Sequence, residues 1–350
     1  MITQAHGNLL DADVEALVNT VNCAGVMGKG IALQFKRAYP AMFRDYARAA
    51  KSGEVTLGHM HVWRTGLLAG PRFVINFPTK GHWRTRSSLA DIDNGLADLV
   101  RVLQELDIKS VAIPPLGCGN GGLEWTDVEP MIRTALAALP HVDVVLYPPG
   151  PAPAAQQMKT ATVRPPLTLA RASLIDLLSR YLERTLEASP IEIQKLLYFL
   201  QVSGEPLKLQ YTKGLYGPYA DNLRHALQAL EGHYLVGFGD GNALVREAEP
   251  IRPLPGAETE AVEFLVSHPT TLERIARVLE LVEGFESPYG IELLATVHWV
   301  SERDPQAASD ATAAVSAVRA WSRRKERMFT PDHVTAAWTA LRERDWIAAA

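Results

Sequence analysis

Three segments of the sequence combine glycine, amide and basic side chains in patterns that suit a sugar-phosphate ligand. The first runs from Asn19 to Gly30 and places Asn19 and Asn22 ahead of three glycines. Glycines let backbone N–H groups approach phosphate oxygens, a following helix N-terminus adds positive potential, and amide side chains bond ribose hydroxyls. Because the segment matches neither the P-loop nor the dinucleotide-binding glycine pattern, the alternative is a strand-to-helix turn that needs positive φ.

The second segment runs from Leu116 to Leu123 and holds four glycines within six residues. It follows an apolar run and precedes a helical pattern. Such a loop wraps tightly around an anion. The composition predicts a phosphate-binding loop, and the alternative is a flexible connection.

The third segment carries side chains able to do chemistry. Lys80 follows a strand-like run and stands beside Gly81. A desolvated lysine acts as a nucleophile or forms a Schiff base, here at C1 of a sugar. His82 is a candidate acid or base. Three aromatic or basic side chains follow: Trp83, Arg84 and Arg86. Such side chains can stack a base and hold the phosphates of a single strand. The same set also suits a solvated surface.

Strand and helix patterns alternate through the first 150 residues, which predicts an α/β fold with a mainly parallel sheet. We expect strands at 14–21, 59–64, 72–77, 110–114 and 142–147. Helices are expected at 30–50, interrupted by Pro40, at 88–106 with Ser88 as N-cap, and at 126–139 with a Thr126–Glu129 capping box. Each of the three segments follows a strand, so all should meet at the carboxyl edge of the sheet, where ligands bind.

A proline-rich stretch at 148–153 ends this pattern and predicts a linker over 151–166. The domain expected before it is 1–150, and the domain after it, 167–350, is mostly helical. Helices are expected at 167–186, from a capping box at Ser189, at 257–284, at 290–300 and after Pro331. A turn is expected at 216–219, and a hairpin should join 235–238 to 243–246.

Bulk properties exclude several classes of protein. With only Cys23 and Cys118 the chain has no disulfide scaffold and no cysteine-rich zinc site, and we expect no metal and no cofactor. Residues 1–150 carry 14 basic and 14 acidic side chains, leaving 21 − 25 = −4 for the rest, so bulk charge does not hold this protein to nucleic acid. No apolar run reaches the ~18 residues that span a bilayer, and no secretion signal is visible, so we expect a cytoplasmic protein without membrane contact.

Four segments in combination resemble the macrodomain family. They are Gly7-Asn8-Leu9-Leu10, Val18 to Asn22, Gly25 to Ala32, and Pro114 to Gly122. The resemblance covers about residues 1–150 and is strongest to the terminal ADP-ribose glycohydrolases, in particular to antitoxins paired with DarT-type toxins. It implies a mixed, mainly parallel sheet between helices. It also implies an enzyme that removes ADP-ribose from bases of single-stranded DNA, where such toxins attach it.

The resemblance also implies roles for individual residues. Lys80 would attack or polarise C1 of the distal ribose, Asn22 would lie beside that ribose, and Asn8 would accept a bond from the adenine amino group. The remaining residues expected around ADP-ribose lie on the strand ends and the two glycine-rich segments: Leu9, Asn19, Thr20, Gly25, Val26, Met27, Gly28, Lys29, Gly30, Ile31, Ala32, Thr79, Leu116, Gly117, Cys118, Gly119, Asn120, Gly121, Gly122 and Leu123.

Two departures from the family pattern bear on this reading. Asn8 stands where many macrodomains have aspartate, so it accepts without charge. The second glycine segment has Asn120-Gly121-Gly122 where the subgroup often has an aspartate. A lysine–aspartate mechanism is therefore open to question, and either Lys80 acts without a carboxylate or another residue such as Glu124 helps, although Glu124 equally suits a structural role.

The second half resembles the Panacea-type helical domain of several antitoxins, through Ile193 to Phe199 and Tyr216 to Tyr219. This resemblance implies that residues 167–350 bind and neutralise the cognate toxin. Two other functions remain open. One is a reader that binds ADP-ribose without cutting it, and the other is a glycohydrolase that acts on ADP-ribosylated protein carboxylates.

Overall fold

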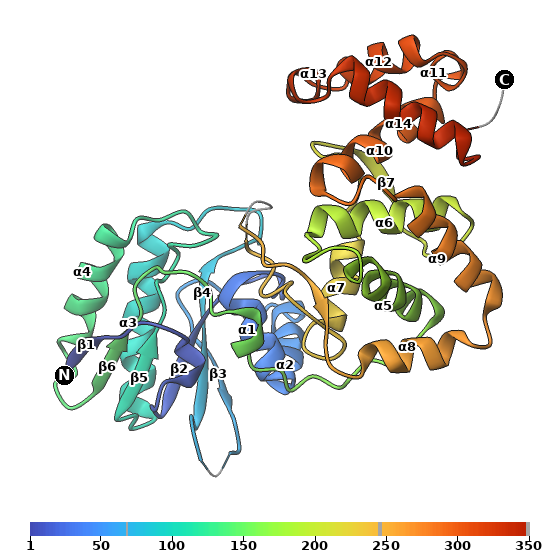
Figure 1. Ribbon diagram of the computed structural model, residues 1–350. Coiled ribbons are helices and arrows are strands. Elements are labelled where there is room, and N and C mark those ends of the chain that lie inside the picture. The colour runs from blue at the N-terminus through green and yellow to red at the C-terminus, as the bar shows by residue number, and fades with distance from the viewer. Residues whose placement is uncertain (68, 244–246, 348–350) are drawn as a thin grey trace. The chain divides into compact units, whose positions relative to one another are not determined.

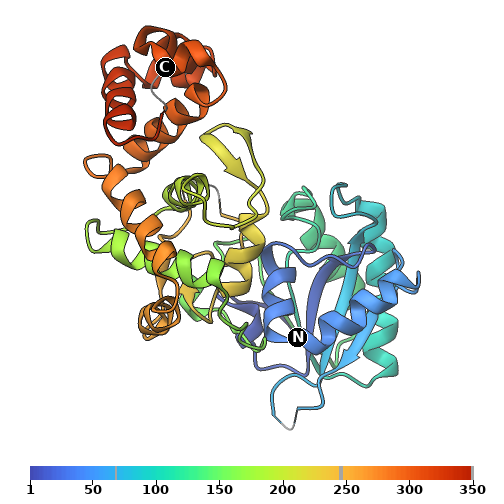
Figure 2. The ribbon, with the colours of Figure 1, turned by 90° about the vertical axis from the view of Figure 1, so that its right-hand side faces the viewer.

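The computed structural model describes residues 1–67, 69–243 and 247–347, which form two compact units. Unit 1 contains residues 1–163 together with Asp240–Asn242, and unit 2 contains the remainder. Figures 1 and 2 show the sheet of unit 1 in blue to green and the helices of unit 2 in green to red. None of the described helices is long and apolar enough to cross a membrane.

Unit 1 is built on a six-stranded sheet in the order β1-β6-β5-β2-β4-β3. All neighbouring strands run parallel except β3, which pairs antiparallel with β4 at the edge. This arrangement confirms the mixed, mainly parallel sheet. The strands are β1 (Ile2–Gln4), β2 (Ala16–Asn22), β3 (His61–Arg64), β4 (Phe73–Lys80), β5 (Ser110–Ile113) and β6 (Asp143–Leu146).

Helices cover both faces of this sheet, and each face has its own apolar core. Helices α3 (Leu89–Glu105) and α4 (Trp125–Leu136) pack on one face, and α1 (Gly30–Ala38) and α2 (Pro40–Lys51) on the other. A strand buried on both faces must be apolar throughout, as β2 and β4 largely are. The helical run from Gly30 divides before Pro40, as predicted, because proline cannot continue the hydrogen-bond ladder.

The structure confirms one of the helix caps predicted for unit 1, contradicts another, and extends one strand. Ser88 caps α3 by accepting from Asp91 N, as expected. The Thr126–Glu129 capping box is wrong, because α4 begins at Trp125 and its N-cap residue Glu124 makes no side-chain cap. Strand β4 continues to Lys80 rather than ending at Phe77, since pairing with β2 persists to the sheet edge. This places Lys80 on the last position of a strand instead of in the loop beyond it.

The extended linker expected over 151–166 contains a segment, residues 155–159, that packs on unit 1. A short 3-10 helix, η2 (Ala155–Gln157), follows the prolines, and Ala155 is buried. Lys159 Nζ then bonds Leu10 O (2.9 Å) and pairs with Asp11 (2.8 Å) of η1 (Leu9–Asp11). Polar side chains thus hold the segment against unit 1, and composition alone did not reveal these partners.

Unit 2 is mainly helical, which confirms the predicted class. The long helical pattern at 257–284 divides at Pro269, and the turn expected at 216–219 is instead the second strand of a short hairpin. Its elements are α5 (Leu169–Leu182), α6 (Pro190–Val202), β7 (Tyr211–Gly214), β8 (Gly217–Ala220), α7 (Leu223–Leu230), β9 (Leu235–Val236), β10 (Arg252–Pro253), α8 (Ala257–Leu265), α9 (Pro269–Leu281), α10 (Pro288–Ser301), α11 (Pro305–Ser309), α12 (Ala311–Arg319), α13 (Arg323–Met328) and α14 (Pro331–Glu343).

The remaining expectations for unit 2 concern a cap and a hairpin. The Ser189 capping box is present, with reciprocal bonds between Ser189 and Glu192. The hairpin expected from 235–238 to 243–246 is wrong in its pairing, because β9 pairs with β10. Residues 244–246 of that expectation lie outside the described residues.

A buried charge cluster lies beneath the β7–β8 hairpin. Glu292 on α10 accepts from Arg324 (2.6 Å) and from Lys325 Nζ (2.7 Å), and both Glu292 and Lys325 are buried. Lys195 on α6 donates to Pro218 O of β8 (2.5 Å), and burial lowers the pKa of Lys195 to about 7 and that of Lys325 to about 8. One carboxylate therefore compensates several cations in the interior.

We expect Glu292→Gln to lower the free energy of unfolding of unit 2 by about 3–5 kcal/mol, since it leaves buried cations without a counter-charge. Chemical unfolding of the full chain, followed by tryptophan fluorescence, measures the change. Glu326→Gln is the matched control, because its partner Arg319 and Glu326 itself are both about half exposed, and such pairs contribute about 0–1 kcal/mol. Equal effects of the two substitutions would contradict the assignment.

Candidate active site

The three segments that could do chemistry meet at the carboxyl edge of the sheet. In the parallel pair β2–β4, Asn22 lies opposite Lys80 after a register shift at Val21/Asn22. Cys23 N then donates to both Lys80 O and Gly81 O (3.1 Å each). The end of β2 and the end of β4 are thus held side by side, and β5 leads into the second glycine-rich segment next to them.

Lys80 is the most distinctive group at this edge. Only 8% of its surface is exposed, and its Nζ donates to Asn120 O in the second glycine-rich segment (2.7 Å). Burial lowers the pKa of the Lys80 ammonium. A lysine of this kind is more often neutral than a surface lysine, and its lone pair is then available to an electrophile.

The first glycine loop, residues 22–30, is shaped by the side chain of Asn22. Its Oδ1 accepts from Ala24 N (3.0 Å) and Val26 N (3.3 Å), and its Nδ2 donates to Val26 O (2.6 Å). The amide expected beside the ribose is therefore occupied by the loop's own backbone. Asn22 fixes the curve of the loop, while Gly25 provides the positive φ of 76° that the curve requires.

The second glycine loop, residues 114–122, is closely packed and pre-shaped. A Cβ on Gly121 would lie 2.3 Å from Gly117 O, so only glycine fits there. Ser87 N donates to Gly121 O (3.0 Å), which fastens this loop to the segment after Lys80. A Cβ on Gly30 would lie 3.5 Å from Asn120 Nδ2, so the two glycine loops face each other, and Lys80 lies at the end of β4, the strand that pairs with β2 on the side away from β5.

The structure places some of the expected ligand residues elsewhere. Asn19 is fully buried in the sheet, where its Nδ2 donates to Asn76 Oδ1 (2.8 Å), so it is not available to a sugar. Asn8 Oδ1 accepts from Leu10 N (3.1 Å) as the cap of η1, which uses one of the two lone pairs of that oxygen. Thr79 bonds Val21 O, and apolar side chains of the set lie in the core: Leu9, Met27 and Leu116.

The segment after Lys80 forms a closed turn rather than a loose loop. His82 O accepts from Thr85 N (3.0 Å) and Thr85 Oγ1 (2.8 Å), and His82 Nδ1 accepts from Arg84 N (3.3 Å). Trp83 is 45% exposed, with the Arg84 guanidinium 4.4 Å from its ring centre. The adjacent Arg86 Nε lies 3.9 Å from a Cβ built on Gly122, and so next to the second glycine loop.

One acidic side chain near this edge was missed as a functional candidate. Burial raises the pKa of the Cys23 thiol, and the charge of Asp91, in the first turn of α3, adds to this shift. In the sequence Asp91 carries only the signal of a helix-capping position, and it does accept from Ser88 Oγ (2.7 Å). Glu124, the alternative from sequence, is the N-cap residue of α4 and makes no side-chain cap.

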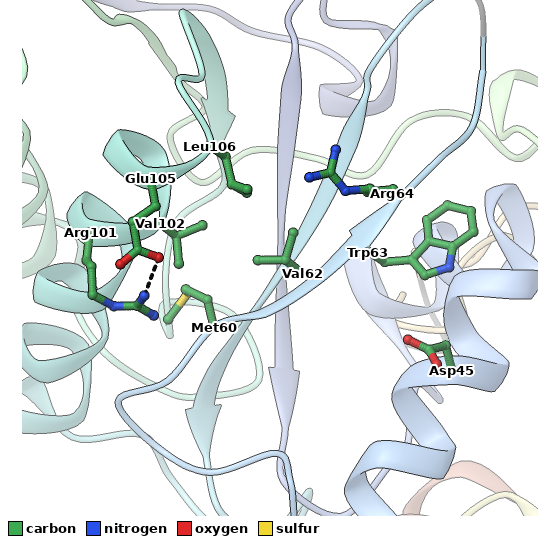
Figure 3. A pocket seen from close by; sticks show the side chains of 9 residues that line it. All are labelled: Asp45, Met60, Val62, Trp63, Arg64, Arg101, Val102, Glu105 and Leu106. Atoms are coloured by element: carbon green, nitrogen blue, oxygen red, sulfur yellow. Dashed lines mark hydrogen bonds and ion pairs between the residues drawn. The ribbon is translucent and has the colours of Figure 1, made fainter.

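A separate hollow of about 610 Å³ lies along the edge strand β3, between α2 and α3. Figure 3 shows Val62 facing Val102 and Leu106 on one side of the strand, and Trp63 with Asp45 on the other. None of the three chemical segments lines it. Its volume reflects the open sheet edge, and the chemistry lies instead where Lys80 and the glycine loops converge.

Comparison with known proteins agrees with this geometry. Residues 18–132 match the Macro domain family. The chain is 48% identical over 351 residues to the DNA ADP-ribosyl glycohydrolase of Mycobacterium tuberculosis, covering 96% of this chain and 98% of that protein. It is 46% identical to the protein of the same name from Thermus aquaticus, covering 98% and 94%.

A third relative joins two activities in one polypeptide. It is the DNA ADP-ribosyl transferase-DNA ADP-ribosyl glycohydrolase fusion protein of Thermosipho africanus, 31% identical over 163 residues. The match covers 42% of each chain.

Proposed function

The chain belongs to the family of DNA ADP-ribosyl glycohydrolases, and we propose that it uses Lys80 to remove ADP-ribose from a base of single-stranded DNA. The observation that carries the proposal is the position of Lys80, which is buried at the end of β4 and contacts both glycine loops, through Cys23 N bonded to its carbonyl and through its Nζ bonded to Asn120 O; burial also lowers its pKa. Such loops suit the diphosphate and distal ribose of ADP-ribose. C1 of that ribose would then lie next to the buried amine.

The reaction breaks the bond between C1 of the distal ribose and the base nitrogen. The neutral Lys80 amine attacks C1, the base nitrogen leaves with the bonding electrons, and a proton is delivered to it. Water then attacks C1, the C1–Nζ bond breaks, and free ADP-ribose and the neutral lysine are regenerated. The bond from Lys80 Nζ to Asn120 O uses one N–H and leaves the lone pair free to point at the sugar.

Because neither glycine loop contains a carboxylate, the proton transfers need another group. The charge of Asp91, in the first turn of α3, acts on Cys23, and Cys23 N bonds Lys80 O and Gly81 O. We infer that Asp91 acts as the acid and base for the two steps, directly or through a water.

The turn at 82–86 supports a DNA substrate over a protein substrate. Trp83 presents an exposed ring on a hydrogen-bonded turn, and Arg84 and Arg86 add positive charge next to the second glycine loop. Aromatic stacking with neighbouring cations is how proteins hold single strands without reading their sequence. We therefore assign His82, Trp83, Arg84 and Arg86 to the nucleotides that flank the modified base.

Unit 2 carries the second part of the proposal, which is binding of a DarT-type DNA ADP-ribosyltransferase toxin. The fusion relative shows that a transferase and a glycohydrolase of this family occur together. Because the residues proposed for the reaction all lie in unit 1, the larger, helical unit 2 has a different task in this proposal, and we assign it the inhibition of the toxin. A protein acting on cellular DNA would work in the cytoplasm.

We expect Lys80→Ala to lower kcat on a single-stranded oligonucleotide bearing one ADP-ribosylated base by at least about 100-fold. The measurement is release of free ADP-ribose. In the parent, kcat/KM should rise with pH and level off at a pKa below 10.5, since burial lowers the pKa of Lys80 and only its neutral amine attacks. The variant should still bind the cognate toxin. Full activity in Lys80→Ala would remove the lysine from the mechanism, and ADP-ribose binding by the parent without turnover would indicate a reader.

Replacing Asp91 by Asn should reduce kcat about tenfold or more while leaving the affinity for ADP-ribose near that of the parent, because a proton-transfer group acts on the chemical step. Asp93→Asn is the control, since Asp93 is an exposed carboxylate in the same first turns of α3. Single-turnover assays separate the chemical step from release. If the two variants are equally active, Asp91 is only a helix-cap partner.

Trp83→Ala should raise KM for a modified oligonucleotide about 5- to 100-fold, because stacking contributes about 1–3 kcal/mol per base. The KM for a single modified nucleoside should stay unchanged, as that substrate has no flanking base. Leu67→Ala, which removes another exposed apolar side chain of unit 1, serves as the control. A similar loss on both substrates would place Trp83 outside the DNA contact, and faster cleavage of an ADP-ribosylated glutamate peptide than of DNA would favour the protein substrate.

A further inference from the structure

Helix α2 packs against the first glycine loop. Tyr46 is fully buried, and its hydroxyl donates to the Asn22 carbonyl at the start of the loop. A Cβ on Gly25 would lie 3.2 Å from Ala50 Cβ and 3.6 Å from the Ala47 backbone. The loop therefore touches α2 at two points, through a hydrogen bond at Asn22 and through small-residue packing at Gly25.

The Tyr46 ring is itself held from the side by polar groups. His61 on β3 meets it edge-on, with ring centres 6.1 Å apart and planes at 72°. Asn76 Nδ2 lies 3.1 Å from His61 Nδ1, and Asp45 Oδ2 lies 3.2 Å from His61 Nε2. Since an amide nitrogen only donates, Nδ1 accepts and the proton on Nε2 is donated to Asp45. The imidazole is thereby fixed in one orientation against the phenol.

The Asn22 carbonyl is a sensitive point at which to anchor the loop. Asn22 lies opposite Lys80, and the next amide, Cys23 N, bonds Lys80 O and Gly81 O. A shift of the peptide between residues 22 and 23 therefore moves both the first glycine loop and the backbone of Lys80. Misplacement by about 1 Å at a reacting centre costs on the order of 100-fold in rate.

From these contacts we propose that Tyr46 is a positioning residue for ADP-ribose, holding the first glycine loop in the shape that receives the diphosphate and distal ribose. The inference rests on the proposed function only in its choice of ligand. The side chain itself does not touch the substrate. It acts through the Asn22 carbonyl, as the second layer of a site must when the binding groups are backbone amides of a glycine-rich loop.

The test compares Tyr46→Phe with Tyr39→Phe in the full chain. Tyr39 stands where α1 meets α2 and packs on Phe35 and Trp63, so the control also removes one hydroxyl from a ring that keeps its packing. Isothermal titration with free ADP-ribose, thermal unfolding and turnover on the modified oligonucleotide are measured for each. We expect Tyr46→Phe to bind ADP-ribose at least fivefold more weakly and to turn over at least tenfold more slowly than the parent, and Tyr39→Phe to match the parent.

A purely structural role would lower the melting temperature of Tyr46→Phe without changing the affinity per folded molecule, and that result would overturn the proposal. Ala50→Val tests the same contact from the other side, because its added methyl groups press on Gly25, where a built Cβ would already lie only 3.2 Å from Ala50 Cβ. It should weaken ADP-ribose binding as well, and unchanged affinity in both variants would refute the idea. The titration with ADP-ribose tests the role of Tyr46 even if the parent does not hydrolyse DNA adducts. Failure of this inference can therefore be distinguished from failure of the proposed function.

Discussion

The parallel pairing of β2 with β4 is the constraint on which the site depends. Its register brings Asn22 beside Lys80 and lets Cys23 N bond both Lys80 O and Gly81 O. A slip of one residue would turn Lys80 to the other face of the sheet, away from the second glycine loop. The apolar faces of both strands fix that register, because each is buried beneath helices on both sides. The packing of helices on both faces of the sheet thus determines where Lys80 and the first glycine loop lie.

The sequence predicted the architecture of unit 1 well, for physical reasons. Strand and helix periodicities are local, and Pro40 and Ser88 act within one turn of where they stand. The convergence of the three chemical segments followed from topology, since parallel strands present their carboxyl ends on one edge. The structure agrees with this at Lys80 and at both glycine loops.

What the sequence could not show were the partners of polar side chains. Asn22 and Asn8 have the chemistry of ligand contacts, but the side-chain oxygen of each accepts from nearby backbone N–H groups. Asn19 sits in mid-strand, and its partner Asn76 is 57 residues away. Asp91 and Tyr46 look ordinary in the chain, as a helix-start acid and a core aromatic, because the proposed role of Tyr46 comes from its bond to Asn22 O and that of Asp91 from its charge acting on Cys23. Only the folded chain assigns each donor its acceptor.

The open strand β3 has a consequence for the behaviour of the protein at high concentration. An unpaired sheet edge is a template on which another chain can add a strand. Here the edge is only four residues long and ends in the exposed Arg64, while Arg101 borders the hollow beside it. A second copy approaching edge to edge would have to desolvate Arg64 and the ion pairs of Arg101 with Asp98 and Glu105. This short, charged edge therefore disfavours the addition of strands from other copies of the chain, and with it fibre-like self-association.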